Sequence, residues 1–83
     1  MDRVLPDDIG HRIYRLRRVL GVKQRELADY IGISPALLCR MEYGDRRVRE
    51  HNLEKICRAL RVTIEDICKP EEEFQKLLTA LQG

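Results

Sequence analysis

The stretch Gln24–Gly44, QRELADYIGISPALLCRMEYG, decides the fold, because it predicts two short helices joined by a tight turn. Gly32 stands where the chain must reverse, in a backbone conformation with positive φ that glycine adopts without strain. The second helix opens with Ser34, whose hydroxyl can cap it, and with Pro35, which suits a first helical turn. This layout predicts a helix-turn-helix over residues 24–43.

Apolar residues with helical spacing accompany this motif and continue on both sides of it. Within the motif, Ala28 is small enough for the two helices to cross closely, and the side chains that should point into one core are Leu27, Ile31, Ile33, Leu38 and Met41. Further helices are expected from the acidic residues before Ile9 up to Gly21, and over residues 50–60, 64–68 and 71–81. Thr63 and Asp66 predict a capping box, whereas Lys23 replaces the Ser, Thr or Asn expected as a cap. The predicted fold class is all-α.

Length and composition limit the chain to one small domain. It has 83 residues, of which 36% are charged and 5% aromatic, and no apolar run approaches the ~20 residues that cross a bilayer. The start MDRVLPDD lacks the features of a signal peptide, so we expect a cytoplasmic protein with no membrane partner. No effector domain is evident, so we expect no small-molecule effector.

The residue types that usually carry catalysis or bind metals are scattered. Cys39, Cys57 and Cys68 lack ligand spacing and are expected to be buried or half-buried thiols. Cys39 is placed toward the outer face of its helix, which leaves a redox role open. His11 and His51 are expected on the surface. With no nucleophile paired with a base and no glycine-rich phosphate loop, we expect no enzyme, no metal and no cofactor.

Positive charge is concentrated around the motif. Residues 1–49 hold eleven Lys and Arg against seven Asp and Glu, whereas residues 50–83 hold five against seven. The arginines form two groups, one before the motif and one after it: Arg12, Arg15, Arg17 and Arg18, then Arg46, Arg47 and Arg49. This distribution favours a nucleic-acid partner.

The same segments resemble the lambda-Cro/434-repressor-like class of bacterial and phage regulators, of the XRE type. The resemblance spans residues 9–67 and is carried by Ile9-Gly10, Arg17, Gln24, Glu26-Leu27-Ala28, Ile31-Gly32-Ile33-Ser34, Leu38, Met41-Glu42, Gly44 and Ala59-Leu60-x-Val62. It implies a five-helix fold whose third helix, residues 35–43, enters the DNA major groove. In size the chain is also similar to the controller proteins of restriction-modification systems.

The resemblance implies a DNA-binding domain over residues 1–69, followed by an additional helix in residues 70–83. It also implies that Gln24 binds a backbone phosphate at the start of its helix, although a simple helix-starting role is the alternative. Arg17 and Glu42 match an ion pair of the family, which would fix the angle between two helices. Glu42 is therefore expected to be structural.

Residues on the outer side of the third helix are the candidates for reading DNA. At 100° per residue, Ala36, Cys39, Arg40 and Tyr43 share one side, and Leu37, Leu38 and Met41 the other. Arg40 can bind guanine O6 and N7, or act as a phosphate clamp only. Pro35, Ala36 and Leu37 have no side-chain hydrogen bonds to offer, so Ala36, together with Pro35 or Leu37, is expected to meet thymine methyl groups.

Residues at the two ends of this helix are further candidates. Ser34 is expected to cap the helix and is placed for a phosphate contact. Arg46 and Arg47 match a family loop that follows the DNA backbone and can reach a compressed minor groove, where they would read shape. Tyr43 is expected to contact sugar or phosphate, or to cover the core.

The predicted function is a sequence-specific regulator, a repressor or autoregulator, that binds double-stranded DNA at a palindromic operator as a homodimer. The apolar candidates for the dimer interface are Ile64, Ile67, Phe74, Leu77, Leu78 and Leu81. Alternatively, the last helix folds back onto its own subunit. A different class of function, a protein-interaction module such as an antitoxin or a transcriptional co-factor, is the competing hypothesis.

Overall fold

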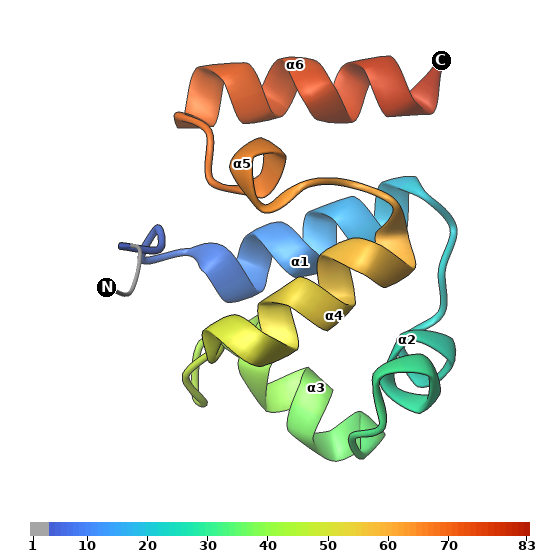
Figure 1. Ribbon diagram of the computed structural model, residues 1–83. Helices are drawn as coiled ribbons and strands as arrows, with labels where there is room; N and C mark the ends of the chain where they lie inside the picture. The colour runs from blue at the N-terminus through green and yellow to red at the C-terminus, as the bar shows by residue number, and fades with distance from the viewer. Residues whose placement is uncertain (1–3) are drawn as a thin grey trace.

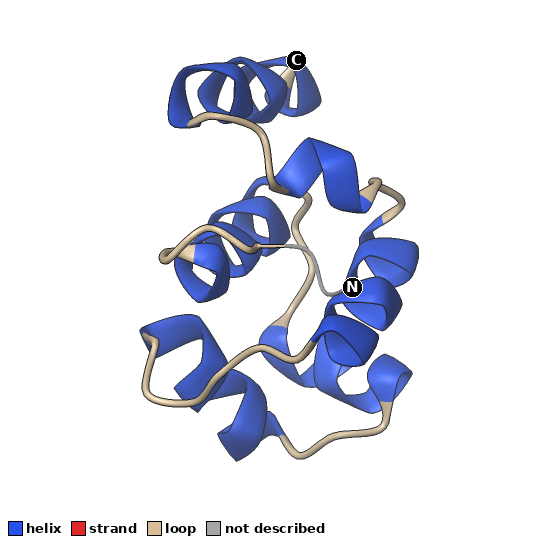
Figure 2. Ribbon diagram, turned by 60° about the vertical axis from the view of Figure 1, so that its left-hand side comes forward, coloured by secondary structure: helices blue, strands red, loops and turns tan. Residues whose placement is uncertain are grey.

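Six α-helices and no strand occupy residues 4–83, which are the residues that the computed structural model describes. The helices are α1 Ile9–Val19, α2 Gln24–Ile31, α3 Pro35–Tyr43, α4 Glu50–Leu60, α5 Ile64–Ile67 and α6 Glu71–Gln82. Figure 1 shows α1 in the middle of the molecule, with α2 and α3 at the end farthest from α6. Figure 2 shows only helices and their connecting loops. The all-α prediction is confirmed, while the first three residues of the predicted domain lie outside the described part.

Local signals in the sequence place the helix boundaries well. α2, α3 and α4 begin and end at the predicted residues, α5 stops one residue earlier, and α6 runs one residue further. None of the helices between residues 4 and 83 has the length and apolar character required to span a membrane.

The core is aliphatic and surrounds a single phenylalanine. α1 lies at its centre and packs against α3, α4, α5 and α6. The largest side chains that are fully buried come from all six helices: Ile13, Leu16, Leu27, Leu38, Met41, Leu53, Ile56, Ile67 and Phe74. Residues of α6 therefore belong to the same core as the helix-turn-helix.

α1 and α3 cross at backbone contact. Gly10 is buried in α1, and a Cβ atom built on it would lie only 1.9 Å from the carbonyl oxygen of Met41 and 3.0 Å from its carbonyl carbon. Any larger residue would meet backbone that has no rotamer to change. Glycine at this position thus sets how closely α3 approaches α1.

Arg12 is buried and anchors the segment that links α5 to α6. Its Nη1 donates to the carbonyl oxygens of Ile67, at 2.9 Å, and of Lys69, and its Nε donates to the Asp8 carboxylate at 3.1 Å. The guanidinium carbon also lies 5.0 Å from the centre of the Phe74 ring. Buried charge of this kind is stable only when its donors are satisfied, and here the Asp8 carboxylate and two backbone carbonyls, one at the end of α5 and one in the linker, accept from it.

Arg15 holds α6 on α1 from the outside. Its Nη1 and Nη2 donate to the two carboxylate oxygens of Glu71, at 3.0 and 2.9 Å, and Nη2 also donates to Gln75. The guanidinium carbon lies 5.1 Å from the ring centre of Phe74. These bonds hold the pKa of Glu71 below its ordinary value, and the Glu71 hydrogen bond is the largest cause of the raised pKa of Arg15.

Short capping motifs define several other helix ends. Thr63 and Asp66 form the predicted capping box, each side chain accepting the other's backbone N–H, at 3.0 and 3.2 Å, and the hydrogen bond from the Thr63 N–H lowers the pKa of Asp66. At the start of α2, the Glu26 carboxylate accepts the Lys23 N–H at 2.9 Å and compensates for the missing cap. α4 ends at Arg61 in the left-handed conformation, with φ of 59°.

Candidate nucleic-acid interface

The turn between α2 and α3 has the geometry that its residues predict. Gly32 ends α2 with φ of 79°, and its N–H donates to the Ala28 carbonyl oxygen. The Ser34 hydroxyl accepts the Leu37 N–H at 3.0 Å, and Pro35 occupies the first turn of α3. The predicted cap is therefore confirmed, and the amino end of α3 has a defined direction.

The predicted ion pair between Arg17 and Glu42 is present and fixes α3 to α1. Arg17 Nε donates to one carboxylate oxygen at 2.8 Å and Nη2 to the other at 3.0 Å, and the two side chains are 7% and 5% exposed. Arg17 Nη1 also donates to the Val22 carbonyl oxygen at 3.0 Å. The pair is bidentate and enclosed, so Glu42 has a structural role.

Gln24 joins this network from α2. Its Nε2 donates to Glu42 Oε1 at 3.0 Å, and the side chain is partly buried. One carboxylate thus receives hydrogen bonds from α1 and α2 while it belongs to α3. The three helices that present the candidate interface are held at fixed angles by a single polar cluster.

The outward side of α3 carries few polar groups. Ala36, Arg40 and Tyr43 are exposed, whereas Pro35, Leu37 and Cys39 are half-buried. Tyr43 is 82% exposed, so it is not a lid over the core, and the lid alternative is wrong. Arg40 is the only charged side chain on this side of α3, since Glu42 is buried in the ion pair.

A basic loop follows α3. Gly44 reverses the chain with φ of 88°, and the N–H groups of Asp45 and Arg46 donate to the Arg40 carbonyl oxygen at 2.9 and 3.3 Å. Val48 is buried and anchors the loop, while Arg46, Arg47 and Arg49 are exposed around it. The loop that follows α3 therefore carries three exposed arginines.

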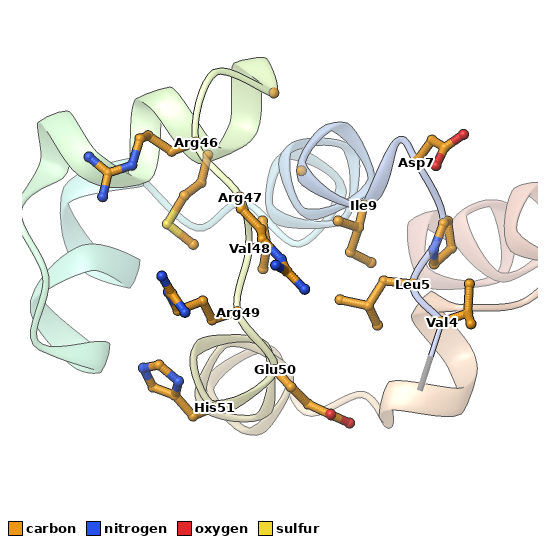
Figure 3. Close-up of a pocket in the computed structure, with 14 residues that line it drawn as sticks. Val4, Leu5, Asp7, Ile9, Arg46, Arg47, Val48, Arg49, Glu50 and His51 are labelled. Carbon is orange, nitrogen blue, oxygen red and sulfur yellow. The ribbon is translucent and has the colours of Figure 1, made fainter. Parts of the chain in front are cut away.

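A hollow of about 860 Å³ separates this loop from the N-terminal segment. Figure 3 shows Leu5 and Ile9 on the side of that segment and α1, with Arg47 and Val48 on the loop. Arg49 and His51 also line the hollow, and both are exposed. The sequence placed Arg49 in a basic group and His51 on the surface without assigning either to a site. Arg47, Arg49 and His51 follow one another at every second residue, and this spacing was the sequence signal that could have placed them together.

The basic group in α1 does not belong to this surface. Arg12 and Arg17 are buried in internal contacts, and Arg15 is bonded to α6. Only Arg18 of that group is exposed. The interpretation that both arginine groups indicate a nucleic-acid partner is therefore wrong for the first group, because tertiary packing engages most of its members.

The predicted apolar dimer interface is largely internal. Ile67, Phe74 and Leu78 are buried within their own chain, so these three cannot face a partner in this arrangement. Ile64 and Leu77 are half-buried, and Leu81 is 37% exposed. The last helix folds back onto its own subunit, which was the alternative prediction.

The remaining chemistry-bearing residues are dispersed. Cys57 is buried, and Cys39 and Cys68 are half-buried, as expected of thiols in a helical core. His11 and His51 are exposed, as predicted. Within residues 4–83, no three His, Cys, Asp or Glu side chains gather in a way that would hold a metal ion.

Comparison with known proteins gives matches that agree with the geometry of α2 and α3. The family model of the Cro/C1-type HTH DNA-binding domain matches residues 12–73. The cryptic phage CTXphi transcriptional repressor RstR of Vibrio cholerae serotype O1 is 32% identical over an alignment of 76 residues that covers 89% of this chain and 68% of the relative.

Solved structures with the same architecture include two transcription factors. The clp gene regulator ClgR from C. glutamicum is similar with a TM-score of 0.72 and 25% identity, over 100% of this chain and 97% of that one. The hypothetical transcription factor NHTF from Neisseria has a TM-score of 0.73 at 24% identity, over 93% and 95% of the two chains, which supports the fold alone.

Proposed function

The chain belongs to the Cro/C1-type helix-turn-helix DNA-binding family and is a transcriptional regulator, and we propose that it represses transcription from a palindromic operator that two copies bind together. The observation that carries this proposal is the rigid presentation of α3. The Arg17, Glu42 and Gln24 side chains fix α3 to α1 and α2, while Arg40 and Tyr43 remain exposed beside a basic loop.

Direct base reading would rest on a small number of contacts. Arg40 would bind the O6 and N7 atoms of a guanine, and Ala36, with Pro35 or Leu37, would meet thymine methyl groups. An α3 with so few hydrogen-bond donors favours a half-site in which one G·C pair is accompanied by thymines. Cys39 is half-buried and adds little to this surface.

Contacts with the DNA backbone would come from both sides of α3. Ser34 and the start of α2, at Gln24, lie where helix N–H groups favour phosphate. Tyr43 is exposed enough to reach sugar or phosphate. Arg46 and Arg47 would follow the backbone toward the operator centre and read the width of the minor groove.

Two copies are proposed because one small domain covers few base pairs. Half-sites on one face of the duplex lie ~34 Å apart, and a dimer of related domains matches a palindrome of that spacing. The similarity to a named phage repressor favours repression of a nearby promoter over activation.

The test is selection of duplexes from a random pool, followed by affinity measurements on the selected palindrome. Arg40→Ala should reduce discrimination at one G·C pair roughly ten- to hundredfold, because a bidentate arginine contact is lost. Lys76→Ala removes one exposed positive charge from α6, at the far end of the molecule, and should leave discrimination unchanged. Equal effects of the two changes would contradict the assigned reading surface.

Shape reading by the loop has its own test. Replacing Arg46 and Arg47 by alanine should weaken operator binding more than random-duplex binding and should relax the preference at the operator centre. Equal losses on both duplexes would reduce these arginines to general phosphate contacts.

The interaction-module hypothesis predicts a different result. The chain would bind a purified protein partner saturably, and its affinity for DNA would be low and would depend only on salt concentration, not on sequence.

A further inference from the structure

We propose that the hollow between the N-terminal segment and the loop after α3 binds a small organic anion, a carboxylate carried on an alkyl chain, and that this ligand releases the protein from its operator. The carboxylate would pair with the Arg47 guanidinium, and the alkyl chain would lie on Val4 and Leu5. The release rests on the proposed function, in which Arg47 contacts DNA. The binding site stands on the geometry of the hollow itself.

One wall of the hollow is apolar. Val4 is 94% exposed and Leu5 is half-buried, and the buried side chains of Ile9 and Val48 also line the space. The volume of about 860 Å³ lies within the range of roughly 300–1,000 Å³ that is typical of small-molecule sites. An alkyl chain placed here would remove exposed apolar surface from water, which favours binding.

The opposite wall supplies a single positive charge that is directed inward. Figure 3 shows the Arg47 guanidinium extending from the loop toward Leu5 and Ile9, whereas those of Arg46 and Arg49 extend to the other side of the loop. Among residues 4–83, none forms a hydrogen bond or ion pair with the Arg47 guanidinium. Its donors are therefore available to a ligand within the hollow.

The acidic residues of the lining do not occupy this position. Asp7 and Glu50 both line the hollow, and in Figure 3 their carboxylates extend away from Arg47. A guanidinium binds a carboxylate through two parallel hydrogen bonds, which gives both affinity and orientation. One inward cation beside an aliphatic wall therefore matches a monoanion with an apolar body better than it matches a phosphodiester, which has no such body.

Occupation of the hollow would act on DNA binding through Arg47. A guanidinium that is paired with the ligand cannot also contact the operator, and the bound carboxylate adds negative charge beside a loop that has to approach phosphates. The ligand and the operator therefore weaken each other by the same factor. The sequence alone indicates no small-molecule effector because the two walls come from distant segments of the chain.

The binding test uses octanoate on the DNA-free chain, followed by backbone amide NMR shifts. We expect a Kd on the order of 1 mM for a ligand of this size, with the largest shifts in residues 4–9 and 46–51. Acetate carries only the charge and octan-1-ol only the alkyl chain, so each should bind at least about tenfold more weakly than octanoate.

Three variants at exposed positions assign the contacts without disturbing the core. Arg47→Gln should weaken octanoate binding at least about tenfold because the charge-assisted hydrogen bonds are lost. Val4→Ser should weaken it roughly threefold because apolar contact is lost. Arg49→Gln removes the same charge from the same loop, but its guanidinium extends away from Leu5 and Ile9, so this matched control should bind octanoate within about twofold of wild type.

The release test measures affinity for the selected palindrome by fluorescence anisotropy at constant ionic strength. Saturating octanoate should weaken operator binding by wild type at least about tenfold and should leave the remaining affinity of Arg47→Gln unchanged. Acetate at the same concentration should have no effect on either protein.

Several results would overturn the inference. No binding of octanoate at roughly 10 mM, about ten times the expected Kd, equal binding by Arg47→Gln, or equal binding of acetate or octan-1-ol would reject the site. Octanoate binding that leaves operator affinity unchanged would reject the release. A chain that recognises a palindrome but ignores octanoate rejects this inference alone, whereas a chain that binds octanoate through Arg47 but prefers no palindrome rejects the proposed function and leaves the site standing.

Discussion

Gly10→Ala tests how α3 is held in place. The added Cβ would lie 1.9 Å from the Met41 carbonyl oxygen, whereas close carbon–oxygen contacts are about 3.3 Å, so the helices must part by roughly 1.4 Å. Both sides of the contact are backbone within helices, and neither can turn away by changing a rotamer. α3 would therefore move as a body away from α1.

The magnitude follows from two opposing effects. Alanine is favoured over glycine in a helix by about 1 kcal/mol, which alone would make the variant more stable. Overpacking of a core costs about 1–3 kcal/mol, and parting the helices also stretches the ion pair between Arg17 and Glu42, whose complete loss would cost about 3–5 kcal/mol. We expect a net loss of about 2 kcal/mol or more, which corresponds to a fall in Tm of about 8–16 °C in a domain of this size.

Thermal unfolding followed by circular dichroism provides the measurement, with His11→Ala as the matched control. His11 is the next residue of α1 and is exposed, so its replacement by alanine should leave Tm nearly unchanged or slightly raised. A Gly10→Ala variant as stable as wild type, or more stable, would refute the close backbone crossing of α1 and α3.

Three further outcomes are expected. Arg17→Met should cost about 3–5 kcal/mol in urea unfolding because it leaves Glu42 buried without its charge partner, and Arg17→Met combined with Glu42→Leu should cost clearly less than the sum of the single changes. Arg61→Gly should raise the free energy of unfolding by about 1 kcal/mol because it relieves the left-handed backbone, and an unchanged midpoint would show that the conformation carries no strain. Because Arg15 holds the pKa of Glu71 below its ordinary value, ionised Glu71 stabilises the fold at neutral pH, and this stabilisation is lost as pH falls from about 5 to 3. Melting curves of Glu71→Gln should accordingly depend less on pH over that interval than those of wild type.

The helix-turn-helix could be predicted because its signals are local. Ser34 and Pro35 define the start of α3, Gly32 and Gly44 end two helices in the left-handed conformation, and the apolar spacing fixes the buried side. Each signal acts within one or two turns of chain. Helix boundaries that depend on such signals agree with the structure to within one residue.

The fate of the α1 arginines could not be predicted in the same way. Arg12 and Arg15 lie in a run that resembles a solvated basic face, yet apart from Asp8 their hydrogen-bond partners are 55 to 60 residues away, at the end of α5, in the α5–α6 linker and in α6. A count of charges along the sequence contains no information on such pairing. The ion pair between Arg17 and Glu42 was predicted only through the family resemblance, although it too joins distant segments.

The apolar residues that were expected to form the dimer interface show a second limit of prediction from sequence. An apolar stripe on a terminal helix has the same pattern whether it packs on its own chain or on another copy, since both arrangements exclude the same side chains from water. The burial of Phe74 and Leu78 shows that the stripe has a receptor on α1 and α5. The sequence predicts only that the apolar stripe of α6 is shielded from water. The structure shows that α1 and α5 shield it.

The Gln24 side chain links the hydrogen bonds that fix α3 to the site of the proposed phosphate contact. Because Nε2 donates to Glu42, the amide group orients the first turn of α2 and cannot direct that same N–H toward DNA. The N–H groups of the first helical turn have no partner within the helix and point along its axis. A phosphate at this end would therefore be met chiefly by backbone N–H groups and the helix dipole, with Gln24 fixing the direction in which they point. The same carboxylate of Glu42 would then set both the angle of α3 and the position of the proposed phosphate contact, so a change at Arg17 or Gln24 is expected to alter the two together.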